Sequence, residues 1–247
     1  KKMFSDIGIM QKLTSRVENG VPYYYTGAYS GYFNCIIKSA DLITWEYVAA
    51  PDFINLSMWE NAVYVIGNRC YCFVRQHECM QGFLTYYNLD AKTWATPCLI
   101  RDAQSRSDFI VYDGALYLIH APLDRNGFGI VRVNPDDLAR SVPVLVADMQ
   151  DSLFYPYAEV HGGEMYLSYT VDRKHIRLAR VDAREKFEGL SVVKKGFAGQ
   201  SPFFVLYLTF RMYLSESRLF VVDDVIQYGL ILQRNLKIRN HFNEHCV

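Results

Sequence analysis

The feature that most constrains this chain is an internal repeat. A tyrosine that follows a glycine turn recurs at intervals of 47, 46 and 49 residues, at Tyr24, Tyr71, Tyr117 and Tyr166. An aspartate that closes an apolar run recurs at intervals of 49, 46 and 46, at Asp41, Asp90, Asp136 and Asp182. Two independent markers that share one period indicate a repeat protein.

Each repeat predicts four short β-strands. In the second repeat, apolar runs alternate with turns such as Gly67-Asn68-Arg69, and strands are expected at 62–66, 70–74, 83–87 and 94–100. The third repeat predicts strands at 109–112, 116–121, 128–133 and 142–146, and the fourth at 157–160, 165–170, 176–181 and 192–193. Four antiparallel strands in a period of ~40–50 residues are typical of a β-propeller blade.

The length of 247 residues fits five such repeats in one domain. The predicted fold class is all-β, a single β-propeller over residues 1–247 with about five four-stranded antiparallel blades. The blades are expected at 1–50, 51–100, 101–147, 148–194 and 195–247. The last is degenerate, because Tyr213 keeps the interval without a glycine turn before it, and residues 223–242 fit either helix or strand.

Charge and hydropathy exclude two classes of partner. With 26 basic and 26 acidic residues and no basic run, we expect no nucleic acid to bind. No apolar stretch reaches the ~18 residues of a membrane helix, and the longest, 203–214, contains Arg211 and predicts buried strands. The composition leaves the oligomeric state open. The first residues lack the apolar core of a secretion signal, as a processed chain also would.

The six cysteines are not spaced like a metal centre, and we expect neither metal nor cofactor. Cys70 and Cys72 lie two apart in a predicted strand and share a face, which does not favour a bridge between them. Unpaired structural thiols are the first expectation, and a disulfide from either of them to Cys98 is the alternative. Cys72, His77 and Cys79 match zinc spacing poorly.

Propeller topology directs a candidate site to one face of the fold. The loops between second and third strands and the entries of the innermost strands share that face around the axis. The entries are expected at 15–16, 59–61, 106–108 and 154–157, with 201–202 as the fifth. Residues distant in sequence are therefore expected to meet there.

Two carboxylates open innermost strands in neighbouring repeats. An apolar wall of Trp59 and Phe109 beside Glu60 and Asp108 favours a protonated carboxyl, which suits a general acid. A pair of such groups is what glycoside hydrolysis requires. The alternative is that each accepts backbone N–H bonds at a strand entry. Glu159 has the parity to face the same channel.

Aromatic and basic residues complete the candidate set. Tyr155 and Tyr157 are nucleophile or sugar-stacking candidates, with core packing as the alternative. Arg75, Arg125 and Arg173 come from the loops of three successive repeats. Converging guanidiniums would make a site for a carboxylate, although polar loop tips explain each arginine as well.

Two turns carry a family resemblance. Ser39-Ala40-Asp41-Leu42-Ile43-Thr44-Trp45 and Asn88-Leu89-Asp90-Ala91-Lys92-Thr93-Trp94 resemble shortened Asp-boxes of the sialidase superfamily, with one residue and the glycine missing. Arg106-Ser107-Asp108-Phe109 is similar to inner-strand entries of sialidases and of the five-bladed arabinanase-type glycosidases, and Tyr155-Pro156-Tyr157 to sialidase-like blade entries. The resemblance covers about residues 10–193.

The resemblance implies an enzyme that acts on glycans from the axial funnel. Arg75, Arg125 and either Arg173 or Arg106 would match the arginine triad of sialidases, Tyr155 or Tyr157 with Glu159 or Glu60 the nucleophile pair, and Asp108 the acid. The Glu-Gly-Pro of an arabinanase-type acid falls at Phe154-Tyr155-Pro156, where the glutamate is absent.

Three functions remain in competition. The first is a sialidase-like glycosidase for an acidic or uncharged sugar, with Arg75, Arg106, Arg125, Arg173, Trp59 and Tyr157 binding substrate. A propeller that binds carbohydrate or acts as a scaffold without chemistry is the second, and a lyase on uronic-acid polymers is the third. A glycan substrate favours a secreted or periplasmic location.

Overall fold

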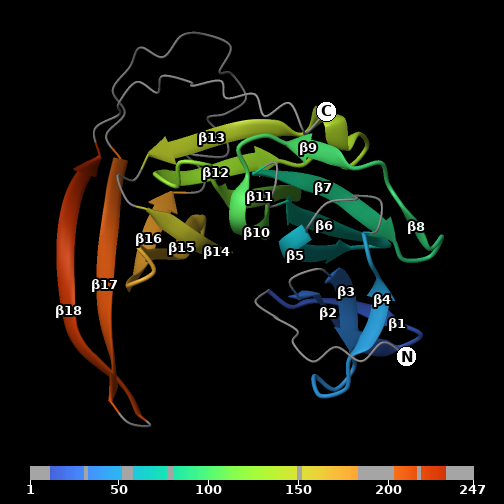
Figure 1. Ribbon diagram of the computed structural model, residues 1–247, viewed down its shortest axis with the longest axis horizontal. Helices are drawn as coiled ribbons and strands as arrows, with labels where there is room; N and C mark the ends of the chain where they lie inside the picture. Colours follow the sequence, from blue (N-terminus) through green and yellow to red (C-terminus); the bar gives the residue numbers. More distant parts are fainter. Residues whose placement is uncertain are drawn as a thin grey trace. The chain divides into compact units, whose positions relative to one another are not determined.

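The computed structural model describes residues 12–30, 33–51, 58–76, 80–148, 152–182, 203–215 and 218–231, and these are β-strands and turns apart from one short 3-10 helix (Figure 1). That helix, Leu138–Arg140, begins after Asp137, whose side chain accepts the N–H of Ala139. The predicted all-β class is confirmed for this part of the chain. Among the same residues, no helix is long and apolar enough to span a bilayer.

Four sheets follow one another along the chain, each a meander of antiparallel neighbours. The first sheet contains β1 (Thr14–Glu18), β2 (Val21–Ser30), β3 (Phe33–Ser39) and β4 (Glu46–Ala49). The second contains β5 (Met58–Ile66), β6 (Arg69–Gln76), β7 (Gln81–Asn88) and the short pieces β8 (Thr93–Trp94) and β9 (Cys98–Ile100), which both pair with β7. The third contains β10 (Gln104–Tyr112), β11 (Ala115–Ala121), β12 (Gly127–Arg132) and β13 (Val142–Asp148).

The fourth sheet is longer than the repeat predicts. It contains β14 (Leu153–His161), β15 (Glu164–Val171), β16 (His175–Asp182), β17 (Phe203–Ser215) and β18 (Arg218–Ile231). The strands expected in 203–214 are therefore present, and they extend this sheet through the pairing of β16 with β17. The fourth strand expected at 192–193 lies outside the described residues. Residues 223–231 of the ambiguous tail belong to strand β18.

The chain clusters into two compact units. The described residues up to Phe109 form the first, together with Asn134–Ser141, and Ile110–Val133 with the residues from Val142 onward form the second. The first unit has a core of aliphatic side chains from β5 and β6 with Tyr25, Ile36 and Tyr87. The second has a core built on β11, β12, β14, β15 and β16. Alternate residues of β15 are buried, as expected for a strand with one face on this core.

The cysteines with described side chains are free thiols. Cys70 and Cys72 lie on one face of β6 and pack in the first core, where burial raises their pKa. Burial likewise raises the pKa of Cys35 to about 12. Cys98 is partly exposed, and Cys79 and Cys246 lie outside the described residues. The thiols therefore serve as small apolar side chains of the core.

The turn after the third strand of each of the first three sheets is organised by one side chain. Ser39 Oγ accepts the N–H of Leu42 at 2.8 Å. Asn88 Oδ1 accepts those of Asp90 and Ala91 at 3.0 and 2.9 Å. Asn134 Oδ1 accepts those of Asp136 and Asp137 at 3.0 and 3.1 Å. A side chain that binds the N–H groups two or three residues on replaces the glycine such a turn often needs.

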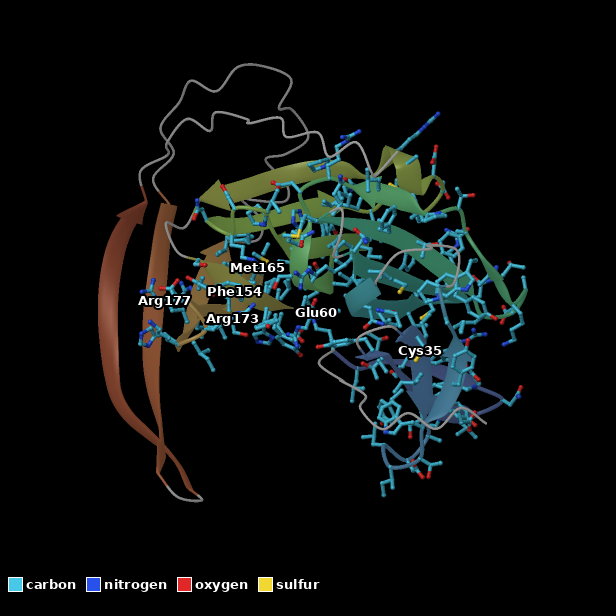
Figure 2. The ribbon with its side chains drawn as sticks, in the orientation of Figure 1. Cys35, Glu60, Phe154, Met165, Arg173 and Arg177 are labelled. Carbon is cyan, nitrogen blue, oxygen red and sulfur yellow. The ribbon has the colours of Figure 1, made fainter. Side chains whose placement is uncertain are left out.

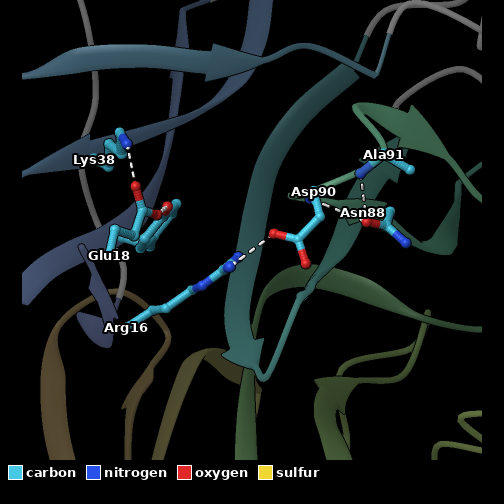
Figure 3. A network of polar contacts seen from close by, with 7 residues as sticks. Arg16, Glu18, Lys38, Asn88, Asp90 and Ala91 are labelled. Carbon is cyan, nitrogen blue, oxygen red and sulfur yellow. Dashed lines mark hydrogen bonds and ion pairs between the residues drawn. The ribbon is translucent and has the colours of Figure 1, made fainter. Parts of the chain in front are cut away.

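These turns also receive arginines from the preceding sheet. Arg16 Nη2 of β1 lies 2.8 Å from Asp90 Oδ1, in the turn of the second sheet (Figure 3). Arg69 of β6 donates to the carbonyl of Pro135, in the turn of the third sheet. Lys38 and Glu18 form a separate ion pair at 2.6 Å within the first sheet. We call the two arginine contacts the rim contacts.

Candidate functional site

The innermost strands are irregular near their entries. The register between β5 and β6 shifts between Met58 and Asn61, and that between β14 and β15 between Phe154 and Tyr157. In β10, Ser105 has a φ of 65°, and in β14 Tyr155 has a φ of 56°. Such bulges re-aim side chains and are common beside functional sites. The strand entries proposed from the sequence are therefore distorted in three sheets.

Glu60 lies in the bulge of β5 and is buried (Figure 2). Its Oε2 is 2.8 Å from Nη1 of Arg75, which is only 9% exposed. The Nε of the same guanidinium donates to Oε1 of Gln104 at 3.1 Å. Arg75 thus connects the entry of β5 to the entry of β10. The sequence placed Arg75 in a loop, but it belongs to β6 and pairs with Gly82 of β7.

Asp108 occupies the middle of β10 and is also buried. Its Oδ2 lies 3.2 Å from Nζ of Lys12, which also donates to the carbonyl of Phe109 at 3.0 Å. Its Oδ1 accepts the N–H of Phe109 at 2.9 Å. This contact is the one expected under the alternative in which Asp108 binds backbone N–H groups. The Phe109 ring meets Tyr64 edge to face, with 6.5 Å between centroids.

Both carboxylates therefore have a cation within hydrogen-bonding distance. A buried carboxyl group needs such a partner to offset the loss of its contact with water. Paired carboxyl groups are the residue type that glycoside hydrolysis uses. The first compact unit thus holds two buried carboxyl groups next to cations.

The second compact unit brings together a tyrosine and a glutamate that the sequence paired. Tyr157 and Glu159 lie two apart in β14, and the Tyr157 hydroxyl donates to Oε1 of Glu159 at 3.1 Å. Glu159 is exposed and Tyr157 is partly exposed. Tyr155 is adjacent to the Phe154 ring, 6.2 Å between centroids. This arrangement can polarise the Tyr157 hydroxyl, since the carboxylate accepts its proton.

Two of the predicted arginines converge in the same unit. The guanidinium carbon of Arg125 lies 4.3 Å from the centroid of the Phe154 ring. That of Arg173 lies 4.9 Å from the same centroid, and Figure 2 labels both Arg173 and Phe154. Arg75 and Arg106 belong to the first unit, where Arg75 has the partners described above and Arg106 is half-buried in β10. The side chain of Trp59 lies outside the described part of the chain.

Three residues that shape these clusters were missed in the sequence. Lys12 precedes the first strand and has no marker around it. Gln104 belongs to a polar run, 104–108, that looks like a loop, although four of its five residues are buried in β10. The sequence signal that could have shown Gln104 to be part of the strand is a polar run followed directly by an apolar one. Phe154 was expected at the entry of an innermost strand and at the place where a catalytic glutamate is absent, but not as a ring that contacts arginines.

The donor set does not resemble a metal centre. Within the described ranges, no group of three or more histidine, cysteine, aspartate or glutamate side chains is arranged to hold an ion. The nearest charged partners of Glu60 and Asp108 are instead Arg75 and Lys12. The chemistry offered by these residues is that of carboxylates and guanidiniums.

Comparison with known proteins gives the fold. No protein-family model and no curated protein sequence matches the chain. An exo-beta-1,3-galactanase structure from Clostridium thermocellum matches 80% of this chain at 14% identity, with a TM-score of 0.53. A xylan beta-1,4-xylosidase structure from Bacillus halodurans C-125 matches 90% of this chain at 12% identity, with a TM-score of 0.53. The GH43B structure of a Bacteroides ovatus xyloglucan locus matches 83% of this chain at 11% identity, with a TM-score of 0.54.

These likenesses are structural and concern the fold alone. The matched regions are 53%, 53% and 48% of the three solved chains, so this chain spans about half their length. The fold shared with these structures is an all-β propeller fold, and the matched structures include glycoside hydrolases of family 43. The predicted propeller resemblance is confirmed for the fold, while the glycosidase and Asp-box assignments remain predictions.

Proposed function

We propose that this chain is the propeller domain of a glycan-processing hydrolase, a glycosidase whose ligand is a carbohydrate. The observation that carries the proposal is the pair of buried carboxylates, Glu60 and Asp108, each held by a cation at an irregular inner strand. Burying an ionisable side chain in an apolar strand costs free energy unless the side chain is paired. Such buried ionisable groups are concentrated at functional sites. The fold likeness to family 43 glycosidases supports the same class.

The proposed fold is a propeller of about five four-stranded blades over the whole chain, with shortened Asp-boxes of the sialidase kind at the turns after Ser39 and Asn88. Its blade boundaries are those predicted from the repeat. In this proposal Asp41 organises its turn as a box aspartate does, since its Oδ1 accepts the N–H groups of Ile43 and Thr44 at 2.8 and 2.7 Å.

In the proposed reaction Glu60 acts as the base and Asp108 as the acid. Glu60 takes a proton from the water that attacks the anomeric carbon, and Asp108 gives a proton to the glycosidic oxygen that leaves. Arg75 and Lys12 hold the two carboxyl groups in place. Tyr155, Tyr157 and Glu159 remain candidates for nucleophile and proton transfer, and Arg106, Trp59 and the other arginines for substrate binding.

The test is substitution of the two carboxylates. Asp108→Asn and Glu60→Gln should each lower the release of reducing sugar from a panel of plant and microbial glycans by about 10²–10⁴-fold. Asp136→Asn, at an exposed turn aspartate, is the matched control and should keep full activity. Melting temperatures of all variants show whether each still folds. Unchanged hydrolysis in both carboxylate variants rejects the proposal.

A carbohydrate-binding propeller without chemistry is the second candidate. The observation that favours it is Phe154, which stands where an arabinanase-type enzyme has its acid and whose ring is flanked by two guanidiniums. This function predicts retention of glycans on an array with no product by mass spectrometry. Product formed by the wild type and lost in Asp108→Asn decides for the hydrolase.

A further inference from the structure

Gln104 is an uncharged side chain within the buried polar cluster of the first compact unit. It is the first residue of β10 and is 0% exposed. Its Oε1 accepts the Nε–H of Arg75 at 3.1 Å, and its Nε2 donates to the carbonyl of Ala103 at 3.1 Å. The side-chain amide therefore has a partner on its oxygen and another on its nitrogen.

These two partners leave the Gln104 amide a single orientation. A carbonyl oxygen only accepts hydrogen bonds, and a guanidinium only donates them. The amide must therefore turn its nitrogen to Ala103 and its oxygen to Arg75, because the reverse orientation loses both bonds. A buried polar group without a partner costs free energy, so the interior holds the Gln104 oxygen in this one place.

A glycine in a neighbouring strand allows Ala103 to approach. Gly82 of β7 pairs with Arg75 of β6. A Cβ at Gly82 would lie 2.1 Å from the Phe73 ring and 3.3 Å from the Cβ of Ala103, which is fully buried. The missing side chain of Gly82 thus lets Ala103 pack against the second sheet next to the Arg75 backbone. Ala103 in turn anchors the amide of Gln104.

The oxygen of Gln104 sets the plane of the Arg75 guanidinium. The Nε–H bond lies in the plane of this group, and its N–H bonds keep a fixed fork geometry. An acceptor at Nε therefore also fixes the direction of the other N–H bonds. One of these, at Nη1, donates to Oε2 of Glu60 at 2.8 Å. The position of the Glu60 carboxyl group thus depends on Gln104 through Arg75.

We propose that Gln104 is a positioning residue of the candidate site, which fixes Glu60 through the guanidinium of Arg75. Arg75 holds Oε2 of Glu60, while Oε1 accepts no hydrogen bond from the part of the chain that the structure describes. A carboxyl group held at one oxygen can take a proton at the other. This inference rests on the proposed function, in which Glu60 is the base, and Gln104 acts only through Arg75.

The first measurement requires no catalysis. Exchange of the Arg75 Nε–H with water is followed by nitrogen-15 NMR, and the signal is assigned by its absence in Arg75→Lys. A buried, hydrogen-bonded N–H exchanges slowly, so Gln104→Met should speed up the exchange at least about tenfold. Thr85→Val is the control, because Thr85 is fully buried and its hydroxyl donates to the carbonyl of Ala95 at 2.8 Å. This variant also loses a buried hydrogen bond but should leave the Arg75 exchange unchanged.

The second measurement is kinetic and uses the glycan of the panel that the wild type cleaves fastest. Gln104→Met should lower kcat by about 10–100-fold and leave KM within about twofold, because only the position of Glu60 changes. Thr85→Val should keep kcat. Gln104→Glu retains an acceptor for Arg75 and should keep more of kcat than Gln104→Met. In the Arg75→Lys background Gln104→Met should have little further effect, since lysine has no guanidinium plane to orient.

The outcomes separate this inference from the proposed function. Unchanged exchange in Gln104→Met overturns the hold on Arg75. A normal kcat in Gln104→Met, where Glu60→Gln abolishes hydrolysis, overturns the positioning role and leaves the hydrolase standing. Fully multiplicative losses in the double variant overturn it too, since Gln104 then acts without Arg75. A wild type that cleaves no glycan rejects the hydrolase and the positioning role with it.

A second variant covers the case in which Gln104→Met does not fold. Gln104→Asn keeps the amide, but its side chain is one methylene too short to reach Arg75 from the same backbone position. It should show the same faster exchange and the same loss of kcat. Wild-type values of both in Gln104→Asn overturn the inference.

Discussion

Asn61 fills the space left by the missing side chain of Gly27. A Cβ at Gly27 would lie 2.0 Å from Oδ1 of Asn61, which is fully buried. The Asn61 amide donates to Oδ1 of Asn34 at 2.7 Å and to the carbonyl of Cys35 at 3.2 Å. Asn61 directly follows Glu60, so this contact between β2, β3 and β5 fixes the strand that presents the carboxylate.

The first prediction concerns this close approach. Gly27→Ala should lower the free energy of unfolding by about 1–3 kcal/mol, because the new methyl group displaces a buried and hydrogen-bonded amide. Urea denaturation measures the loss. In the double variant Gly27→Ala, Asn61→Ala the clash is absent, so its destabilisation should be less than the sum of the two single ones. A strictly additive result would show that the two positions do not share space.

The second prediction concerns the buried ion pair of Glu60 and Arg75. Arg75→Met should lower the free energy of unfolding by ~3–5 kcal/mol, since it leaves a buried carboxylate without its cation. Adding Glu60→Gln should recover part of that loss, because the remaining charge is then removed. Chemical denaturation of the single and double variants provides the cycle. An equal loss in the single and the double variant would contradict a charge-based origin.

The third prediction concerns His120, which is buried in β11. Burial lowers the pKa of His120 from 6.5 to about 4, and its Nδ1 contacts the carbonyl of Ala121. The unfolded chain takes up this proton first as the pH falls below 6.5, so the free energy of unfolding should decrease between about pH 6.5 and 4 and then level off for this group. The full decrease amounts to about 3 kcal/mol.

The measurement is a series of denaturation curves across this pH range. His120→Gln should flatten the slope by about one proton. Its neighbour Gly129 offers an independent check, because a Cβ there would lie 2.3 Å from the His120 ring. Gly129→Ala should therefore destabilise the protein at every pH.

The fourth prediction concerns the turn of the first sheet. The N–H groups of Thr44 and Ile43, with the Ser39 hydroxyl, lower the pKa of Asp41 from 3.8 to about 2. Ser39→Ala removes one donor, so the pKa of Asp41 should rise toward 3.8, as followed by carboxyl NMR shifts. Ser168→Ala in β15 is the control. The stabilising effect of Asp41 is present above pH 3.8 and should disappear as the pH falls through about 2.

The regular strands could be predicted from the sequence, because periodic tyrosines, aspartates and glycine turns mark them. β6, β7, β11 and β12 coincide closely with the expected ranges. The entry of β10 could not be predicted from the sequence, because the run from Gln104 to Asp108 is polar and its burial depends on partners in other sheets. The strand of β17 was expected from its apolar run and from Tyr213, but its pairing with the fourth sheet was not, because the glycine turn and the aspartate marker of a repeat are missing there.

The candidate site remains a prediction, and the sequence indicates its residue types better than the contacts between them. Position in the repeat was enough to select Glu60 and Asp108, which the structure buries beside cations. Their partners Arg75 and Lys12 depend on strand register and on a segment outside the repeat. Convergence of Arg125 with Arg173 was anticipated, but the ring on which they meet, Phe154, was not. Side-chain pairing between distant strands is set by packing, which local sequence does not encode.

The rim contacts bear on how a chain of this kind arises. Arg16 reaches the turn that holds Asp90, and Arg69 reaches the turn that holds Pro135, so the second sheet both gives an arginine and accepts one. A gene segment that encodes one sheet then encodes both an arginine and a turn that can bind the arginine of a neighbouring sheet. When such a segment is copied in tandem, each new copy can make these contacts with the copies beside it. Later substitutions can then alter the inner strands without removing the contacts between copies.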